Sequence, residues 1–238
     1  MKQGLVLDKV VLLGRTLEEY RRYFALDLEK LRGKVVLDVA AGVSSFCAEA
    51  NRLGLNVTAS DSIYNLPGDE IRRRCEPDLE QVTQVIGNLK TYRWVFYRSP
   101  ELLRRFRERA YRAFLDDYRS GQGTRYVWGR LPKLPFRDNQ FDLALVSYLL
   151  FVYEDRFDYE FHKRSLLEIM RVTRVEARLY PIVTFEARRC AYLDRLKEDP
   201  DMRHFTFEEV PTDFEFLVNS NYYLRMTMTV RRDEGTAV

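Results

Sequence analysis

Apolar and polar residues follow one another in blocks that predict alternating strands and helices. A fully apolar run at 35–37 is typical of a parallel strand that is covered on both faces. A stretch of small residues, 38–45, follows it and predicts a turn whose backbone comes close to a ligand. A helical pattern then ends near Gly54, and a second apolar run leads to Asp61. We therefore expect a strand–turn–helix–strand unit over Val35–Asp61.

The same kind of patterning continues on both sides of this unit. A capping box at Thr16–Glu19 predicts a helix before the first strand. Further elements are expected in the second half of the chain: a fourth strand at Leu143–Ser147, a helix at Tyr159–Met170 and a strand at Val175–Val183. The apolar runs Phe214–Val218 and Tyr222–Val230 flank Asn219-Ser220-Asn221, which predicts a terminal antiparallel hairpin.

The segment Asn65–Thr124 forms an insertion between the second and third strands, and we expect it to be a helical lid. Gly68–Leu89 has a helical pattern with an interruption at Pro77, and Ser99-Pro100-Glu101 is a typical helix start. Twelve Lys or Arg residues against nine Asp or Glu give the insertion a net charge of +3. Its arginines either form a solvated face or contact an anionic substrate or an RNA backbone. Four aromatic residues between its two helices either wall a substrate pocket or form a small core: Tyr92, Trp94, Phe96 and Tyr97.

The composition predicts one globular domain over 1–238, with residues 1–30 as a helical cap. Hydrophobic residues make up 46% and charged residues 32% of the 238 positions. The net charge of +3 makes no electrostatic case for nucleic acid by itself. The three cysteines are scattered, so we expect no metal site and no disulfide framework. No apolar run is long enough to span a bilayer, and Asp8 and Lys9 interrupt the apolar patch near the start. We therefore expect a cytoplasmic protein without a signal peptide or a membrane partner.

The first turn and Asp61 together favour a nucleoside ligand. A carboxylate at the end of the second strand can accept hydrogen bonds from both hydroxyls of a ribose. A dinucleotide fold would place glycines at three positions of the turn, where this chain has Ala40, Gly42 and Ser44. The single remaining glycine favours a cofactor that carries no phosphate.

A second motif strengthens this interpretation. The central segment of one enzyme family has a characteristic spacing. This chain keeps that spacing at Gly129, at Leu134-Pro135-Phe136 and at Phe141-Asp142. With Asp38, Gly42 and Asp61, they resemble the class I S-adenosylmethionine-dependent methyltransferases. The resemblance covers residues 31–61 and 125–181. The chain also resembles a group of bacterial methyltransferase-like proteins through its Gly14-Arg15-Thr16, Glu19-Tyr20 and Phe161-His162.

The resemblance implies a Rossmann-like α/β fold with a seven-stranded, mostly parallel sheet, helices on both faces and a terminal antiparallel hairpin. It implies S-adenosylmethionine as the cofactor and S-adenosylhomocysteine as the product. Because the helix after Thr16 precedes the first strand, it is expected to pack over the cofactor, and Arg15 and Tyr20 either meet the cofactor's methionyl carboxylate or have a structural role. The candidate cofactor-binding residues are Arg15, Tyr20, Asp38, Ala40, Gly42, Asp61, Ser62, Arg130, Leu131 and Ser147.

The chain departs from the family pattern at two places that bear on function. Arg130 and Leu131 replace the usual Asp-Ala, so adenine recognition is expected to depend on backbone groups and apolar walls. Ser147-Tyr148 stands where enzymes that methylate the adenine amine have Asn-Pro-Pro-Tyr, which argues against that reaction. The candidate catalytic residues are Tyr148 and His162, the histidine as a general base or else as a structural residue.

The leading hypothesis is a methyltransferase that acts on a small molecule by in-line displacement. A second hypothesis is an RNA methyltransferase that grips phosphate through the arginines of the insertion. A third is a cofactor-binding protein without transfer activity, which is favoured if Arg130 blocks productive binding.

Overall fold

The computed structural model describes residues 4–7 and 9–229. Seven strands form its central sheet: β1 (Val35–Val39), β2 (Asn56–Asp61), β3 (Tyr126–Trp128), β4 (Phe141–Ser147), β5 (Thr173–Tyr180), β6 (Phe205–Pro211) and β7 (Tyr222–Met228). Their order is β3-β2-β1-β4-β5-β7-β6. β1 to β5 are parallel, and β7 runs antiparallel to β5 and β6. This sheet confirms the Rossmann-like fold class.

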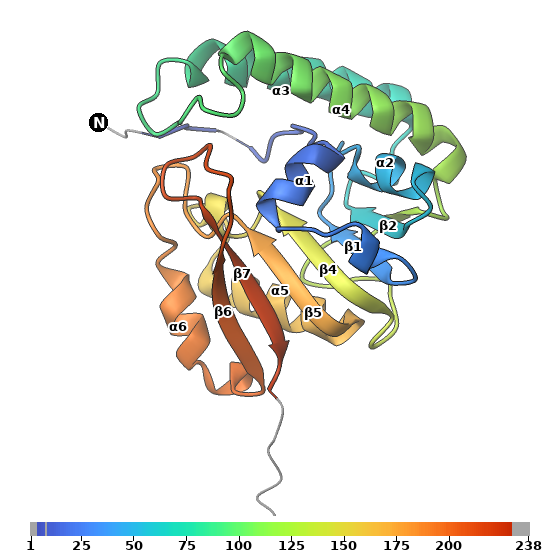
Figure 1. Cartoon of the computed structure of the whole chain (residues 1–238), viewed down its shortest axis with the longest axis vertical. Helices are drawn as coiled ribbons and strands as arrows, with labels where there is room; N and C mark the ends of the chain where they lie inside the picture. Colours follow the sequence, from blue (N-terminus) through green and yellow to red (C-terminus); the bar gives the residue numbers. More distant parts are fainter. Residues whose placement is uncertain (1–3, 8, 230–238) are drawn as a thin grey trace, which may run out of the picture.

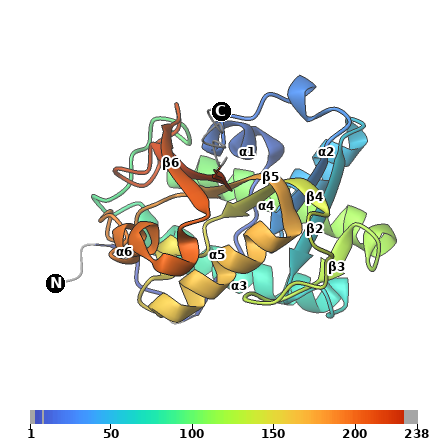
Figure 2. The same ribbon diagram turned by 90° about the horizontal axis from the view of Figure 1, so that it is seen from below.

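Helices cover both faces of the sheet, and each face has its own core. The helices nearest the sheet are α1 (Leu17–Tyr23), α2 (Phe46–Arg52), α5 (Tyr159–Val172) and α6 (Tyr192–Glu198), with short 3-10 helices at Glu29–Leu31, Phe151–Tyr153 and Pro200–Met202. Val36 and Leu145 belong to the core with α1 and α2, whereas Leu37 and Val146 belong to the core with α5 and α6. Figure 2 shows α1 and α2 on one side of the sheet and α5 on the other. Burial on both faces explains why the strands are continuously apolar.

The insertion forms two long helices, α3 (Gly68–Ile86) and α4 (Pro100–Gly121), which lie across the end of the sheet toward which β4 and β5 point (Figure 1). Ser99 caps α4 as predicted, since its hydroxyl accepts a hydrogen bond from the Leu102 amide at 3.2 Å. The interruption expected at Pro77 is wrong, because α3 continues through this residue. Packing of the buried face of α3 against α4 compensates for the backbone hydrogen bond that a proline cannot donate.

The terminal hairpin is present, but its first strand was predicted in the wrong place. β7 pairs with β6, in which Phe205 and Phe207 alternate with polar residues. Segment 214–218 lies in the connection between these strands and pairs with the insertion: the Arg93 amide donates to the Phe216 carbonyl at 2.7 Å, and the Val218 amide donates to the Thr91 carbonyl at 2.8 Å. Its apolar residues therefore meet the aromatic residues of the insertion and not β7.

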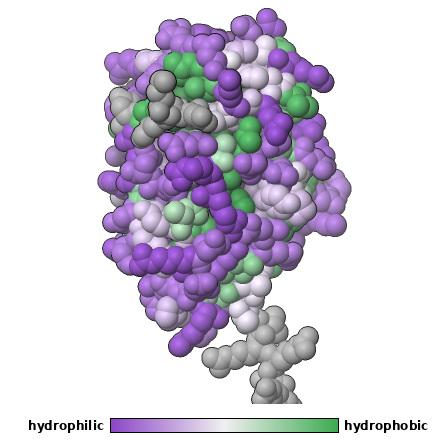
Figure 3. All heavy atoms as spheres, turned by 90° about the vertical axis from the view of Figure 1, so that its left-hand side faces the viewer, coloured by the Kyte–Doolittle hydropathy of each residue, from purple (hydrophilic) through white to green (hydrophobic). Residues whose placement is uncertain are grey.

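The surface shown in Figure 3 is mostly hydrophilic, and its hydrophobic residues lie in separate small patches. Within residues 4–7 and 9–229, no helix combines the length and the apolar character that crossing a membrane requires.

Candidate functional site

A cavity of about 370 Å³ lies at the carboxyl ends of β1, β2 and β4. Its wall includes Ala40–Gly42 after β1, Asp61–Ile63 at the end of β2 and Ser147–Leu149 at the end of β4. This end of an open parallel sheet is where α/β proteins bind their ligands. The cavity is therefore the candidate functional site.

The two turns on the β1–β2 side of the cavity are joined by Asp61. Its carboxylate accepts the Gly42 amide at 2.8 Å and the Ile63 amide at 3.0 Å. Ala40 and Gly42 both have positive φ, at 54° and 55°, so the chain turns sharply past the cavity. Burial raises the pKa of Asp61, and the two backbone amides oppose that shift. The oxygen bonded to the Gly42 amide keeps a lone pair for a ligand hydroxyl, and the other oxygen also accepts the Ser62 hydroxyl at 3.4 Å, a longer contact that a ligand hydroxyl can replace.

Gly129 holds the adjacent wall close to β2. A Cβ at this position would lie 2.4 Å from the Ser60 hydroxyl and 2.9 Å from Pro135 Cδ. The Gly129 amide donates to the backbone carbonyl of Asp61 at 3.2 Å. Arg130 and Leu131 follow directly and line the cavity, so the second sequence motif meets the first one here.

Tyr20 connects the cavity to the buried Asp38. The Tyr20 hydroxyl donates to Asp38 at 2.9 Å and accepts from the Ser44 hydroxyl at 3.3 Å. Tyr20 and Ser44 line the cavity, whereas Asp38 is fully buried behind them. Burial raises the pKa of Asp38. Asp38 therefore does not line the cavity and is connected to it only through Tyr20, whereas the sequence predicted that Asp38 itself binds the cofactor.

Three polar atoms at the β4 end of the cavity have no partner. They are the Ser147 hydroxyl, the Tyr148 hydroxyl and the Nε of Arg15, all buried and without a hydrogen bond among the described residues. The Arg15 guanidinium lies over the Tyr148 ring at 4.4 Å. Tyr148 also has a positive φ of 52°, a conformation that a bulky residue rarely adopts. Unpartnered polar groups and backbone strain at a cavity wall are features of ligand sites.

His162 does not reach the cavity. Its side chain is fully buried, and its two ring nitrogens lie 2.8 Å from the Asp158 carbonyl and 2.9 Å from the Leu150 carbonyl. Both nitrogens are occupied by backbone groups, so the imidazole has no free site for a substrate proton. The structure supports the structural alternative, in which His162 ties the first turn of α5 to the chain after β4.

The cavity brings together most of the residues expected from the sequence: Arg15, Tyr20, Ala40, Gly42, Asp61, Ser62, Arg130, Leu131, Ser147 and Tyr148. Sequence reasoning missed an apolar part of the wall, formed by Leu5, Val10–Leu13, Tyr153, Phe157, Phe161 and Phe185. These residues come from three segments that are far apart in the sequence, 5–13, 153–161 and 185, and no local pattern marks them together as one wall.

Residues 9–15, which we call the strap, form part of that missed wall. Asp78 of α3 accepts the Leu12 amide at 2.8 Å and pairs with the Lys9 ammonium at 2.6 Å. The Val11 amide donates to the Tyr153 hydroxyl at 3.2 Å. The insertion therefore contributes to the site by holding the strap, since no residue of α3 or α4 lines the main cavity.

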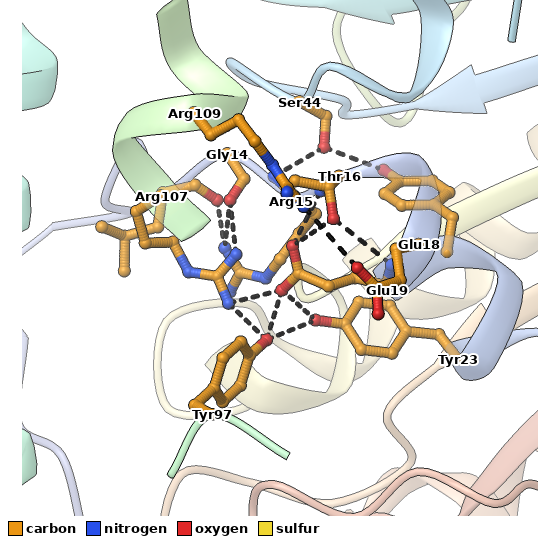
Figure 4. A network of polar contacts seen from close by, with 12 residues as sticks. Gly14, Arg15, Thr16, Glu18, Glu19, Tyr23, Ser44, Tyr97, Arg107 and Arg109 are labelled. Carbon is orange, nitrogen blue, oxygen red and sulfur yellow. Dashed lines mark hydrogen bonds and ion pairs between the residues drawn. The ribbon is translucent and has the colours of Figure 1, made fainter. Parts of the chain in front are cut away.

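A buried polar network fixes the end of the strap to α4 and α1 (Figure 4). Arg107 of α4 pairs with Glu19 of α1 at 2.6 Å and donates to the Gly14 carbonyl at 2.7 Å. The Tyr23 hydroxyl donates to the same carboxylate at 3.0 Å, and Tyr97 also donates to it. Burial by itself raises the pKa of Glu19, but the charges of Arg107 and Arg15 and the hydrogen bonds from Arg107 and Tyr97 together outweigh this effect and lower the pKa to about 2.

The network bears on the alternatives that the sequence left open for the insertion, because most of its arginines are exposed but Arg107 is not. Arg107 is 3% exposed and points into the molecule. Tyr97 is fully buried and packs on Phe216 with a centroid distance of 4.6 Å. The aromatic residues therefore form a core and not a wall of the main cavity. In the part of the chain that the structure describes, no group of acidic, His or Cys side chains could hold a metal ion.

Comparison with known proteins identifies a relative. No family model matches the chain. Uncharacterized protein MJ0045 from Methanocaldococcus jannaschii is 35% identical over 222 residues, which cover 92% of this chain and 97% of the relative. This chain belongs to the same family. This relative comes from an archaeon. The resemblance to a group of bacterial methyltransferase-like proteins therefore stays a prediction.

Solved structures with a similar arrangement are more distant. The PH0226 protein from Pyrococcus horikoshii OT3 has a TM-score of 0.47 and 14% identity, over 85% of each chain. Magnesium protoporphyrin IX methyltransferase from Synechocystis PCC 6803, solved with bound S-adenosylmethionine, has a TM-score of 0.45 and 12% identity, over 90% of this chain and 78% of that one. These similarities are too distant to transfer residue roles to this family.

Proposed function

We propose that this protein is an S-adenosylmethionine-dependent methyltransferase that acts on a small molecule. The observation that carries the proposal is the meeting of two distant motifs, Ala40–Asp61 and Gly129–Leu131, around one cavity at the carboxyl ends of β1, β2 and β4. The cavity volume of about 370 Å³ falls in the range of roughly 300–1,000 Å³ that is typical of small-molecule sites.

The residues present fit the cofactor. The Asp61 carboxylate would accept the ribose hydroxyls, and Ser62 lies beside it. Gly129, Arg130 and Leu131 would face the adenine, while the Gly42 turn and Tyr20 would hold the methionine part. When bound, the cofactor supplies an electrophilic methyl group on a sulfonium. The protein then has to align the methyl acceptor and exclude water, which requires few catalytic side chains.

A small-molecule acceptor is supported by the shape of the site and by the charges around it. The strap crosses the cavity wall, and its backbone is held by Asp78 and Tyr153. Six of the eleven arginines of the insertion pair with carboxylates among the described residues, as Arg104 does with Glu80 and Arg74 with Glu70. These pairs leave less free charge for the phosphates of an RNA.

Calorimetry with S-adenosylmethionine and S-adenosylhomocysteine tests the proposal. We expect both to bind, and we expect Asp61→Ala to weaken binding at least tenfold, which corresponds to about 1.4 kcal/mol. Asp116→Ala is the matched control, because Asp116 is an exposed residue of α4 away from the cavity. Absence of binding, or equal binding by the wild type and Asp61→Ala, would overturn the cofactor assignment.

The alternative of a cofactor-binding protein without transfer activity gives a different result. In that case the protein binds S-adenosylhomocysteine tightly but forms none of it from S-adenosylmethionine in the presence of candidate acceptors. Transfer to any small acceptor decides for the enzyme.

A further inference from the structure

The apolar part of the cavity wall contains no group that could remove a proton from a methyl acceptor. It is formed by aliphatic residues of the strap and by the rings of Tyr153, Phe157, Phe161 and Phe185. Among the described residues of the whole wall, Asp61 is the one carboxylate, and none is His, Lys, Glu or Cys. Asp61 is engaged by the Gly42 and Ile63 amides on the β2 side. An acceptor that binds against the apolar wall must therefore arrive with its nucleophilic atom already unprotonated.

The same wall carries positive charge that the protein does not balance. Apart from the exposed Glu18 and Arg109, the network in Figure 4 contains two guanidinium groups, those of Arg15 and Arg107, and one carboxylate, that of Glu19, and of these three groups Arg15 lines the cavity. Glu19 pairs with Arg107 at 2.6 Å, whereas Arg15 forms no ion pair with any described residue. The Arg15 guanidinium donates to the Leu13 and Gly14 carbonyls, but no carboxylate of a described residue pairs with it, and a partly buried cation without a counter-charge is costly unless a ligand compensates it.

Arg15 acts on the β4 side of the cavity. Its guanidinium covers the Tyr148 ring at 4.4 Å, and its charge lowers the pKa of the Tyr148 and Tyr153 hydroxyls against the larger effect of burial, which raises both. Since Tyr148 stays protonated at neutral pH, its unpartnered hydroxyl remains a hydrogen-bond donor beside this cation.

We propose that the methyl acceptor is a mainly apolar, aromatic small molecule with a weakly acidic O–H or S–H group, which binds as its anion against Arg15 and Tyr148. This inference rests on the proposed function, and it assigns Arg15 to the acceptor and not to the cofactor's carboxylate. The acceptor's proton passes to water when the anion binds. A lone pair of the anion then forms the bond to the methyl carbon, and the electron pair of the broken methyl–sulfur bond stays on sulfur.

The test uses 4-nitrophenol and 4-nitrothiophenol, whose ionised forms absorb at longer wavelength than their neutral forms. Each probe is titrated with the full-length protein across pH, with and without S-adenosylhomocysteine. We expect binding to lower the pKa of the probe by about one unit, because an adjacent cation stabilises the ionised form. A larger pKa shift for 4-nitrophenol indicates an oxygen acceptor, and a larger pKa shift for 4-nitrothiophenol indicates a sulfur acceptor.

The variants separate the role of charge from that of folding. Arg15→Met should abolish the shift and weaken anion binding roughly tenfold, Arg15→Lys should keep most of the shift, and Tyr148→Phe should reduce it. Arg105→Met is the matched control, because Arg105 is exposed on α4 and forms no ion pair with a described residue. Thermal unfolding of each variant shows whether it is folded.

The outcomes distinguish this inference from the proposed function. Tight binding of S-adenosylhomocysteine to Arg15→Met, together with loss of the probe shift, supports the inference. If Arg15→Met weakens binding of S-adenosylhomocysteine but not of methylthioadenosine, which lacks the carboxylate, Arg15 serves the cofactor and the inference is overturned. If wild-type protein binds S-adenosylhomocysteine but shifts neither probe, the inference fails and the proposed function stands. If S-adenosylhomocysteine does not bind, both fail.

Discussion

At the scale of single residues, Gly129 shows how tightly the nucleoside side of the cavity is built. A methyl group at this position would lie 2.4 Å from the Ser60 hydroxyl and 2.9 Å from Pro135 Cδ, so β2 and the following loop would have to separate. The cost follows from contact with neighbours and not from the glycine's backbone angles. The same position carries the amide that bonds to the Asp61 carbonyl, so stability and binding depend on one contact.

Gly129→Ala should therefore lower the free energy of unfolding by about 1–3 kcal/mol, as overpacking does, and weaken binding of S-adenosylhomocysteine. Urea denaturation and calorimetry measure the two effects. Gly68→Ala is the matched control, because a Cβ there meets Tyr118 and Leu115 at ordinary distances of 3.7 and 3.8 Å. Since Gly68 begins α3, its replacement should be neutral or slightly stabilising. Equal behaviour of the two variants would contradict the crowding at Gly129.

At the scale of elements, the ion pair of Glu19 and Arg107 connects α1 to α4 and both to the strap. Replacing Glu19 by Gln leaves Arg107 buried without its counter-charge, and loss of one partner of a buried pair costs about 3–5 kcal/mol. Glu18→Gln is the control on the same helix. Glu18 is exposed and pairs with Arg22 and Arg109 only at 3.9 and 3.7 Å, so its loss should cost no more than about 1 kcal/mol.

The pH dependence of stability gives a second measurement of the same pair. Although burial raises the pKa of Glu19, folding lowers it from 4.5 to about 2, mainly through the charge and hydrogen bond of Arg107, with smaller effects of Arg15 and Tyr97. The stabilisation is therefore complete above about pH 4.5 and is lost as the pH falls toward 2. Urea denaturation of the wild type and of Glu19→Gln should show a difference that is largest at neutral pH and narrows in this acid range. A difference that stays constant from pH 7 to pH 3 would show that the charge of Glu19 is not what stabilises the contact.

The elements differ in how far their place could be predicted from the sequence. The unit Val35–Asp61 was predicted closely, because its strand, turn and helix signals are local and its order along the chain determines its contacts. The capping box at Thr16 and the start at Ser99 were confirmed for the same reason. Segment 214–218 was misplaced, because its apolar pattern fits a strand beside β7 as well as an extended segment beside Thr91 and Arg93.

The candidate site was less predictable than the fold. The cavity residues close to the two motifs could be predicted from the sequence, because their roles follow from their position at strand ends. The burial of Arg107 and the apolar wall from the strap to Phe185 depend on contacts between segments that are far apart in the sequence. A single arginine among eleven in the insertion carries no local sign that it points inward.

At the scale of the whole molecule, the distribution of charge leads to a prediction that separates a small-molecule substrate from an RNA substrate. The net charge is +3, and the insertion contributes twelve basic and nine acidic residues. Several of its arginines pair with carboxylates, as Arg104 does with Glu80 at 2.6 Å and with Glu108 at 3.0 Å. An RNA-binding surface would release many counterions, and its affinity would fall about 10³- to 10⁵-fold between 50 and 200 mM salt.

We expect this protein instead to bind single-stranded or duplex RNA weakly, with a loss of less than about tenfold over that salt range. Fluorescence anisotropy with labelled RNA measures this affinity and its salt dependence. The exposed arginines of the insertion that form no ion pair with a described residue are represented by Arg72, Arg73 and Arg105, and their replacement by Ala should change little. The control replaces exposed arginines elsewhere in the chain, namely Arg137, Arg164 and Arg203. A steep salt dependence that disappears in the insertion variant, but not in the control, would favour the RNA methyltransferase over the small-molecule enzyme.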